Sequence, residues 1–172
     1  FSEIDTTSKR ASKAAGFAWG IAEEIGKNMR NLEMFGLPGI KNLNLYFQKI
    51  KKNPTEKLKK IEKKNKPKSK EFCPIYCGTA FLDNCKKLET LKLIKFFNVS
   101  YPLLFLPFLS RSSDVVGKKI SVKYEKSNFL LNFDRTIFSN NINNDKVVSK
   151  AKEISIEFLE NNNSFSLKEW KE

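Results

Sequence analysis

Three cysteines carry the most reactive side chains of this sequence, and the chain contains no histidine. Three residues separate Cys73 from Cys77, whereas a thioredoxin-like redox pair has two intervening residues and follows a strand. A zinc site needs four ligands, so Cys85 and Asp83 would both have to join that pair. We expect reduced, structural cysteines with no bound metal, and a metal site and a redox pair are the alternatives.

The lack of histidine also excludes nucleophilic devices of the Ser-His-Asp or Cys-His type. The sequence contains no glycine-rich loop of a nucleotide-binding kind, so no cofactor is expected. Glu23 and Glu24 are neighbours on an expected helix, and their side chains diverge by about 100°. They do not form an acid–base pair by themselves, and no catalytic residue is assigned.

Residues 8–37 are the most strongly patterned stretch of the chain. Small or apolar side chains recur there at alternating intervals of four and three residues, which places them on one stripe of a helix. An N-cap oxygen is expected from Asp5, Thr6 or Thr7, and Gly36, Pro38 and Gly39 end the pattern. The stripe consists of Ala11, Ala15, Ala18, Ala22, Ile25, Met29 and Leu32.

Two glycines lie opposite this stripe, where each would cost about 1 kcal/mol relative to alanine in a helix interior. Gly16 and Gly20 could mark a helix break, could be covered by another element of the chain, or could face a ligand or partner. Five residues on this side define what we call the glycine–tryptophan surface, and they are the candidate binding residues: Gly16, Trp19, Gly20, Glu23 and Glu24.

The run AAGFAWGIAEEIGK at residues 14–27 resembles the N-terminal signature of an uncharacterised bacterial family, domain of unknown function 3726. The run CPIYCGTA at residues 73–80 is similar to a second element of that family. The resemblance implies a fragment, because family members continue beyond a C-terminal helix, and it implies no known activity. The wealth of Lys, Asn, Ile and Phe is typical of an AT-rich genome.

The net charge of +13 suggests a nucleic-acid partner, yet only four of the 32 basic residues are arginine. Much of the charge lies in residues 51–70, which we expect to form a basic surface loop. No aromatic residue is interleaved in that stretch for base stacking, so nucleic acid is disfavoured as a partner. The loop is read as a solvated segment.

Reduced cysteines favour a cytoplasmic location. The most apolar run, residues 96–109, contains Pro102 and Pro107 and is shorter than the roughly 20 residues of a spanning helix, so no membrane span is expected.

The order of the patterns predicts an α+β fold in one domain, residues 1–172, incomplete at both ends. N-terminal helices over 8–37 and 40–50 would pack on an antiparallel β-meander, and a further helix would begin near Pro74. The dense apolar run 101–109 is read as a buried strand, and alternation predicts a hairpin over 119–134 and a strand at 154–158. A C-terminal helix, capped by Ser166, would begin at the end of the chain.

Two functions fit these features. The favoured one is a non-catalytic cytosolic binding or accessory protein that uses the glycine–tryptophan surface to hold a protein partner or a small ligand. The alternative is a small enzyme in which Glu23, Glu24 and Asp83 meet in a cleft lined by Trp19.

Overall fold

The computed structural model describes residues 1–134, 136–140 and 147–160 of the chain. The chain divides into two compact units, Phe1–Pro54 and Thr55–Glu172, and each is described by itself. This division is finer than the single domain that the sequence predicts. The fold class is α+β, as expected. Three helices come first along the chain, and the six-stranded sheet follows them.

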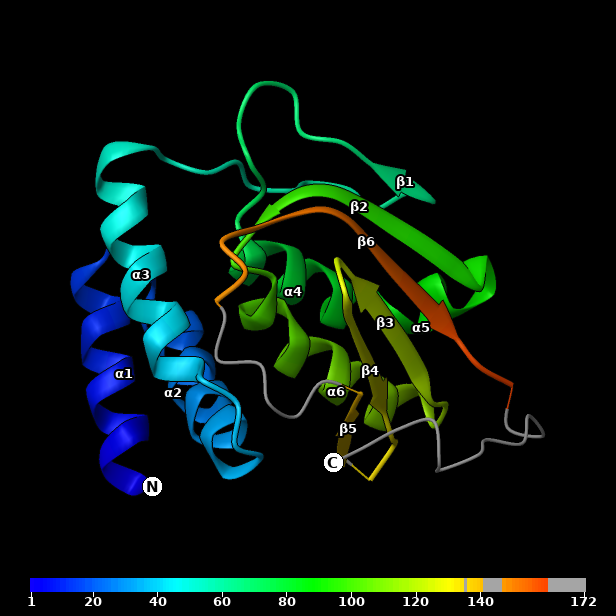
Figure 1. Ribbon diagram of the computed structural model, residues 1–172, viewed down its shortest axis with the longest axis horizontal. Coiled ribbons are helices and arrows are strands. Elements are labelled where there is room, and N and C mark those ends of the chain that lie inside the picture. Colours follow the sequence, from blue (N-terminus) through cyan, green and yellow to red (C-terminus); the bar gives the residue numbers. More distant parts are fainter. Residues whose placement is uncertain (135, 141–146, 161–172) are drawn as a thin grey trace. The chain divides into compact units, whose positions relative to one another are not determined.

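Unit 1 contains three helices, α1 (Ser2–Ala14), α2 (Trp19–Met34) and α3 (Gly39–Lys52), as Figure 1 shows. Gly16 has a φ of +103°, a conformation that favours glycine and ends the first helix. Of the three explanations for Gly16, the helix break is therefore the one that the structure supports. The expected cap at Asp5, Thr6 or Thr7 is wrong, because α1 already begins at Ser2.

The break divides the predicted stripe into two parts with different surroundings. Its larger residues on α2 are buried, and Ile25, Met29 and Leu32 are at most 2% exposed. They share the core of unit 1 with Leu43 and Tyr46 of α3. The alanines at 15 and 18 are instead exposed, because the chain leaves the helical path between α1 and α2.

Unit 2 is built on a mixed sheet with the order β1-β2-β6-β3-β4-β5. Strands β3 and β4 form the predicted hairpin, and β5 pairs with β4, whereas β6, which contains the predicted strand 154–158, inserts between β2 and β3. Strands β1 and β2 run parallel. The bounds are β1 (Lys64–Asn65), β2 (Leu93–Ser100), β3 (Ile120–Tyr124), β4 (Ser127–Leu131), β5 (Ile137–Ser139) and β6 (Lys150–Phe158).

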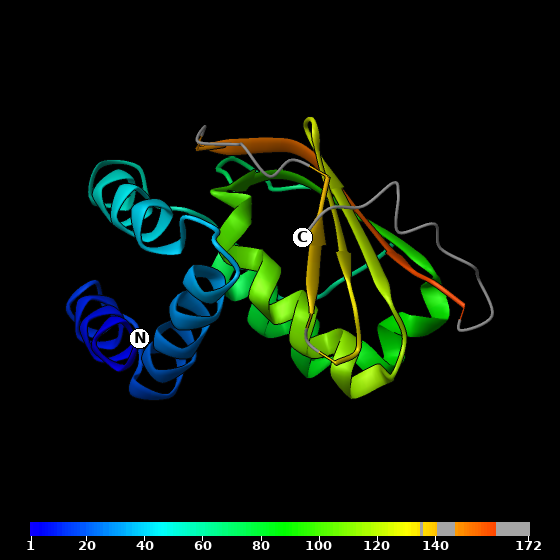
Figure 2. The ribbon, with the colours of Figure 1, turned by 60° about the horizontal axis from the view of Figure 1, so that its bottom comes forward.

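Helices of unit 2 cover one face of this sheet, as Figure 2 shows. They are α4 (Pro74–Asp83), α5 (Cys85–Leu88) and α6 (Leu106–Val116), with the short 3-10 turns η1 (Glu89–Leu91) and η2 (Pro102–Phe105). Phe81 of α4 stacks on Phe158 at 5.8 Å between ring centroids, and Phe105 meets Phe96 edge to face at 5.1 Å. Because these rings come from helices and strands alike, they join the two layers into one core.

The predicted strand over residues 101–109 is wrong, since that run forms η2 and the first part of α6. Every residue from 101 to 110 is buried, so the run carries no helical periodicity that a sequence could reveal. Pro102 and Pro107 do not break a strand but begin η2 and α6, where a missing N–H is tolerated. The predicted C-terminal helix lies outside the described residues.

Candidate functional site

The glycine–tryptophan surface lies where the chain turns from α1 into α2. Gly16 belongs to the connection, and Trp19 is the first residue of α2, so Gly20 falls in the first turn of that helix. The side chain of Trp19 is 54% exposed, whereas the preceding aromatic residue, Phe17, is only 5% exposed. Glu23 is exposed and Glu24 is half-buried. The chain therefore buries one ring of this connection and leaves the larger ring outside.

The glycines of unit 1 differ in what surrounds them. A Cβ atom built on Gly26 would lie 2.5 Å from Asp5 Oδ1, so this glycine lets α1 and α2 approach closely. A Cβ atom built on Gly16 or Gly20 would meet no atom within 4 Å. No described element covers these two glycines, and the packing explanation fails for them. The φ of Gly16 accounts for that residue, while Gly20 has no structural requirement of this kind.

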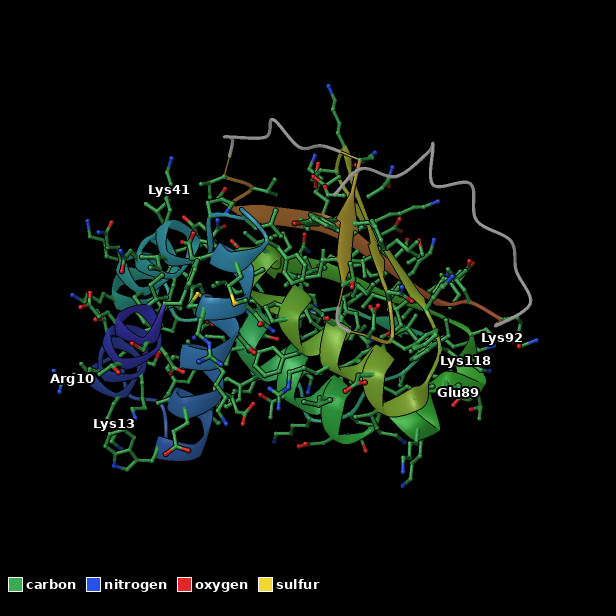
Figure 3. All side chains as sticks on the ribbon, turned by 90° about the horizontal axis from the view of Figure 1, so that it is seen from below. Arg10, Lys13, Lys41, Glu89, Lys92 and Lys118 are labelled. Atoms are coloured by element: carbon green, nitrogen blue, oxygen red, sulfur yellow. The ribbon has the colours of Figure 1, made fainter. Side chains whose placement is uncertain are left out.

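Two lysines of α1 hold the exposed indole. The ammonium groups of Lys9 and Lys13 lie 5.6 Å and 5.9 Å from the centroid of the Trp19 ring, within the range of cation–π attraction. Figure 3 shows Arg10 and Lys13 projecting outward from α1. The site thus combines a large apolar ring with two positive charges.

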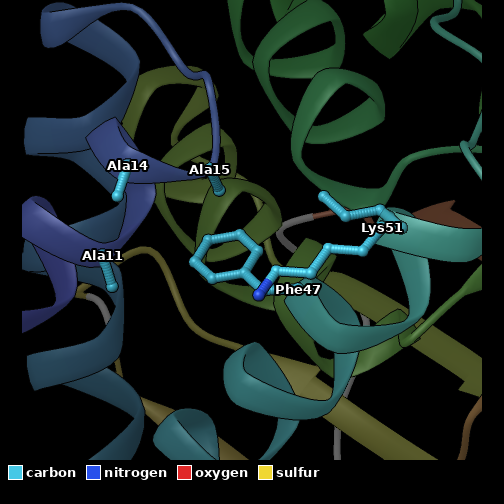
Figure 4. A pocket seen from close by; sticks show the side chains of 6 residues that line it. Ala11, Ala14, Ala15, Phe47 and Lys51 are labelled. Atoms are coloured by element: carbon cyan, nitrogen blue, oxygen red, sulfur yellow. The ribbon is translucent and has the colours of Figure 1, made fainter.

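A pocket of about 420 Å³ opens between α1 and α3, close to the same connection. Figure 4 shows Ala11 and Ala14 of α1, with the adjoining Ala15, facing Phe47 and the stem of Lys51 from α3. Two alanines of the predicted helical stripe, Ala11 and Ala15, border this pocket. Among its lining residues only Lys51 has a charged side chain, and the residues are Ala11, Ala14, Ala15, Phe47, Ile50 and Lys51.

The three carboxylates of the enzyme alternative come from different units. Glu23 and Glu24 are on α2 of unit 1, whereas Asp83 is exposed at the end of α4 in unit 2. Neither unit by itself brings the three groups together.

The cysteines belong to the core of unit 2. Cys73, Cys77 and Cys85 are buried and unbridged. Burial raises the pKa of the Cys77 thiol well above its usual range, and neighbouring Cys73 adds to the effect. A protonated thiol is a poor nucleophile and a poor metal ligand. Among the described residues, no three or more side chains of His, Cys, Asp or Glu are grouped to hold a metal ion.

Sequence patterns missed several residues of this site. The two lysines over Trp19 precede it by ten and six residues, so they reach it only because the chain reverses at Gly16. Phe47 and Lys51 come from a separate helix. Their only sequence signal is a spacing of four, which places them on one face of α3.

A family model described as "Protein of unknown function (DUF3726)" matches residues 1–72. The match confirms the predicted resemblance for all of unit 1, including the glycine–tryptophan surface, while the second quoted run at 73–80 lies just beyond it. No curated protein and no solved structure matches the chain. Within the part of the chain that the structure describes, no helix is both long and apolar enough to cross a membrane.

Proposed function

We propose that this chain is a non-catalytic binding or accessory protein of the cytosol, and that its glycine–tryptophan surface holds a protein partner. One observation supports the proposal above all: Trp19 is 54% exposed beside two glycines that no described element covers. This surface lies inside the residues that match the family model. Nucleic acid is not the proposed partner of this surface.

The physical argument rests on what a partner would gain. A tryptophan side chain buries about 150–250 Å² on contact, and tryptophan is enriched among residues whose truncation costs 2 kcal/mol or more of binding free energy. Lys9 and Lys13 restrict the Trp19 ring before binding, which reduces the entropy lost on association. Gly20 presents bare backbone, so a partner could approach the start of α2 closely.

Capture from a lysate of the source organism, quantified for each variant, tests the proposal. We expect Trp19→Ala and Gly20→Ala to lose the same proteins that the parent chain retains. Met34→Ala is the matched control, because Met34 is 59% exposed on the same helix but at its other end. Thermal unfolding shows whether each variant is folded. If both site variants are folded and retain every captured protein, the surface has no binding role.

The pocket beside Lys51 favours a second candidate, a small ligand with an apolar body and an anionic group. Ala14→Leu would fill the pocket from α1 without touching Trp19. Ligand-observed NMR with short-chain carboxylates would then show binding to the parent chain and none to Ala14→Leu. Protein capture should be unchanged by Ala14→Leu, which separates the two candidates.

The enzyme alternative, with Glu23, Glu24 and Asp83 in a cleft lined by Trp19, makes a different prediction. Each carboxylate would have to be essential for turnover, so amide replacements would abolish activity without reducing partner capture. A triple variant that complements a gene deletion as well as the parent chain would eliminate this alternative.

A further inference from the structure

A second surface, in unit 2, carries a dense cluster of positive charge. Residues 55–70 contain eight lysines and only two acidic residues, Glu56 and Glu62. None of these lysines takes part in the ion pairs found among the described residues. We call these exposed side chains the lysine strip: Lys57, Lys59, Lys60, Lys63, Lys64, Lys66, Lys68 and Lys70.

The carboxylate of Glu56 fixes the end of this segment. It accepts hydrogen bonds from the backbone N–H groups of Lys68, Ser69 and Lys70 at 2.9, 2.7 and 2.8 Å, and from the Ser69 hydroxyl at 3.1 Å. These bonds lower the pKa of Glu56 to about 2. The half-buried carboxylate of Glu56 therefore ties residues 68–70 in place, and this holds Lys68 and Lys70 of the strip beside it.

Asn65 anchors the middle of the segment. Its side chain is buried, and its amide donates to the carbonyl oxygens of Glu62 and Lys95 at 2.8 and 3.0 Å. Its side-chain oxygen accepts from the Glu62 N–H at 2.8 Å. Lys64 and Asn65 also pair with β2 as strand β1, which is an edge strand of the sheet. The strip therefore has a defined backbone, unlike the solvated loop that composition suggests.

Two aromatic rings from outside the segment hold individual lysines. The Lys57 ammonium group lies 4.5 Å from the Tyr76 ring centroid, and Lys66 lies 5.2 Å from that of Phe97. These rings come from α4 and β2, so the sequence of the segment gives no sign of them. Because their faces are occupied by lysines, they are not open platforms for nucleic-acid bases.

We propose that the lysine strip is a preorganised docking surface for an acidic polypeptide segment, separate from the glycine–tryptophan surface. Its charge is complementary to a run of carboxylates. The strip contains no arginine, the residue that reads phosphate and base edges in two-pronged fashion, and this favours carboxylates over nucleic acid. An extended acidic chain can follow the edge strand β1, whose other side has no neighbouring strand in the described sheet.

A labelled glutamate peptide of about ten residues, titrated by fluorescence anisotropy, is the probe. We expect binding at low ionic strength that weakens about tenfold when salt rises from roughly 50 to roughly 200 mM, because exposed charges are screened. At low ionic strength, the double variant Lys64→Ala and Lys66→Ala should bind the peptide more weakly than the parent chain does. Trp19→Ala should bind the peptide as well as the parent chain does. Peptide binding therefore tests the lysine strip independently of the proposed function.

Preorganisation is tested by a pair of variants with equal charge. Glu56→Gln and Glu62→Gln each remove one negative charge and so raise the net charge by one. Of these two glutamates, Glu56 is the one whose side chain holds the segment. We expect Glu56→Gln to weaken peptide binding about fivefold, because the segment must be ordered again on binding, and Glu62→Gln to preserve or slightly strengthen it. Ser69→Pro removes one N–H donor and the hydroxyl without any change of charge. It should weaken peptide binding, as Glu56→Gln does.

Three results would overturn the proposal. The first is equal strengthening by both glutamine variants, together with no effect of Ser69→Pro, which would mean that only net charge attracts the peptide. The second is tighter binding of an oligothymidine of similar length, which would assign the strip to nucleic acid. The third is the absence of peptide binding at low salt. If Glu56→Gln fails to fold, peptide binding by Ser69→Pro and by the double lysine variant still tests the proposal.

Discussion

Both units of this chain contain buried polar atoms with no hydrogen-bond partner among the described residues, but unit 1 contains more of them than unit 2, where Ser110 Oγ is one. In unit 2, Gly78 is required because a Cβ atom there would overlap the Phe108 ring, and Phe81 fills a cluster of rings. In unit 1, Asn28 is 1% exposed, yet neither of its amide atoms has a hydrogen-bond partner among the described residues. Unit 1 also exposes Trp19.

Unit 1 thus contains two features that burial and hydrogen bonding in the folded chain do not explain. A buried amide without partners costs about 1–3 kcal/mol, and an exposed tryptophan forgoes the free energy of burial. Folding alone favours neither, and both occur within residues 1–72, the range that matches the family model and that also includes the lysine strip. The lysine strip of unit 2 is a different case. Hydrogen bonds and strand pairing explain its backbone conformation, whereas folding does not explain its charge.

The largest expected effect on stability comes from a substitution in the core of unit 2. Phe81→Ala removes a fully buried ring that contacts Phe96, Phe105 and Phe158. We expect the free energy of unfolding to fall by about 3–5 kcal/mol in urea titrations followed by circular dichroism. Phe133→Ala is the control, since Phe133 is 46% exposed and should change stability little. Similar effects of the two changes would contradict the assigned core.

A smaller effect distinguishes two glycines on one helix of unit 1. Gly26→Ala places a methyl group against Asp5, and we expect it to destabilise the α1–α2 contact by about 1–3 kcal/mol. Gly20→Ala meets open space and should leave stability unchanged or raise it by up to about 1 kcal/mol.

Hydrogen exchange of the α1 and α2 amides measures both variants within unit 1. Destabilisation by Gly20→Ala would mean that some part of the chain covers that glycine after all. The proposed binding role would then lose its structural support.

Much of the fold was predictable because local patterns and tertiary surroundings agree. The hairpin of β3 and β4 alternates clearly, and Pro74 marks the start of α4 as expected. The run 101–109 was misread because a segment buried on every side has no polar face to show its period. Its two prolines are compatible with a broken strand and with helix starts, and only the structure distinguishes these.

The candidate site was predictable only in part, for a similar reason. The exposed Trp19 and the glycines follow from their mismatch with the helical stripe. The lysines over the indole, and Tyr76 beneath Lys57, depend on contacts between distant parts of the chain. A single sequence carries no record of such contacts, so the aromatic support of the lysine strip could not be foreseen.

The buried amide of unit 1 gives a third way to sharpen the comparison. Asn28→Leu removes two unpartnered polar atoms while it keeps a similar volume, so we expect unfolding free energy to rise by about 1–2 kcal/mol. Asn42→Leu is the control, because the Asn42 amide donates to the Pro38 carbonyl at 2.7 Å and that bond would be lost. Thermal unfolding should therefore rank Asn28→Leu above Asn42→Leu. The reverse order would mean that Asn28 has a partner that stabilises the fold.

The smallest effect concerns pH and the ordered segment of unit 2. Hydrogen bonds from Ser69, Lys68 and Lys70 lower the pKa of Glu56 to about 2, from an unfolded value near 4.5. A lowered carboxylate pKa contributes stability above the unfolded value, and this contribution is lost as pH falls from about 4.5 towards 2. The N–H signals of Lys68 and Lys70 should therefore stay protected at pH 4 and lose protection near pH 2. In Glu56→Gln the same signals should be unprotected at neutral pH. Loss of protection in the parent chain already near pH 4.5 would mean that Glu56 titrates like a free carboxyl group and does not hold the lysine strip.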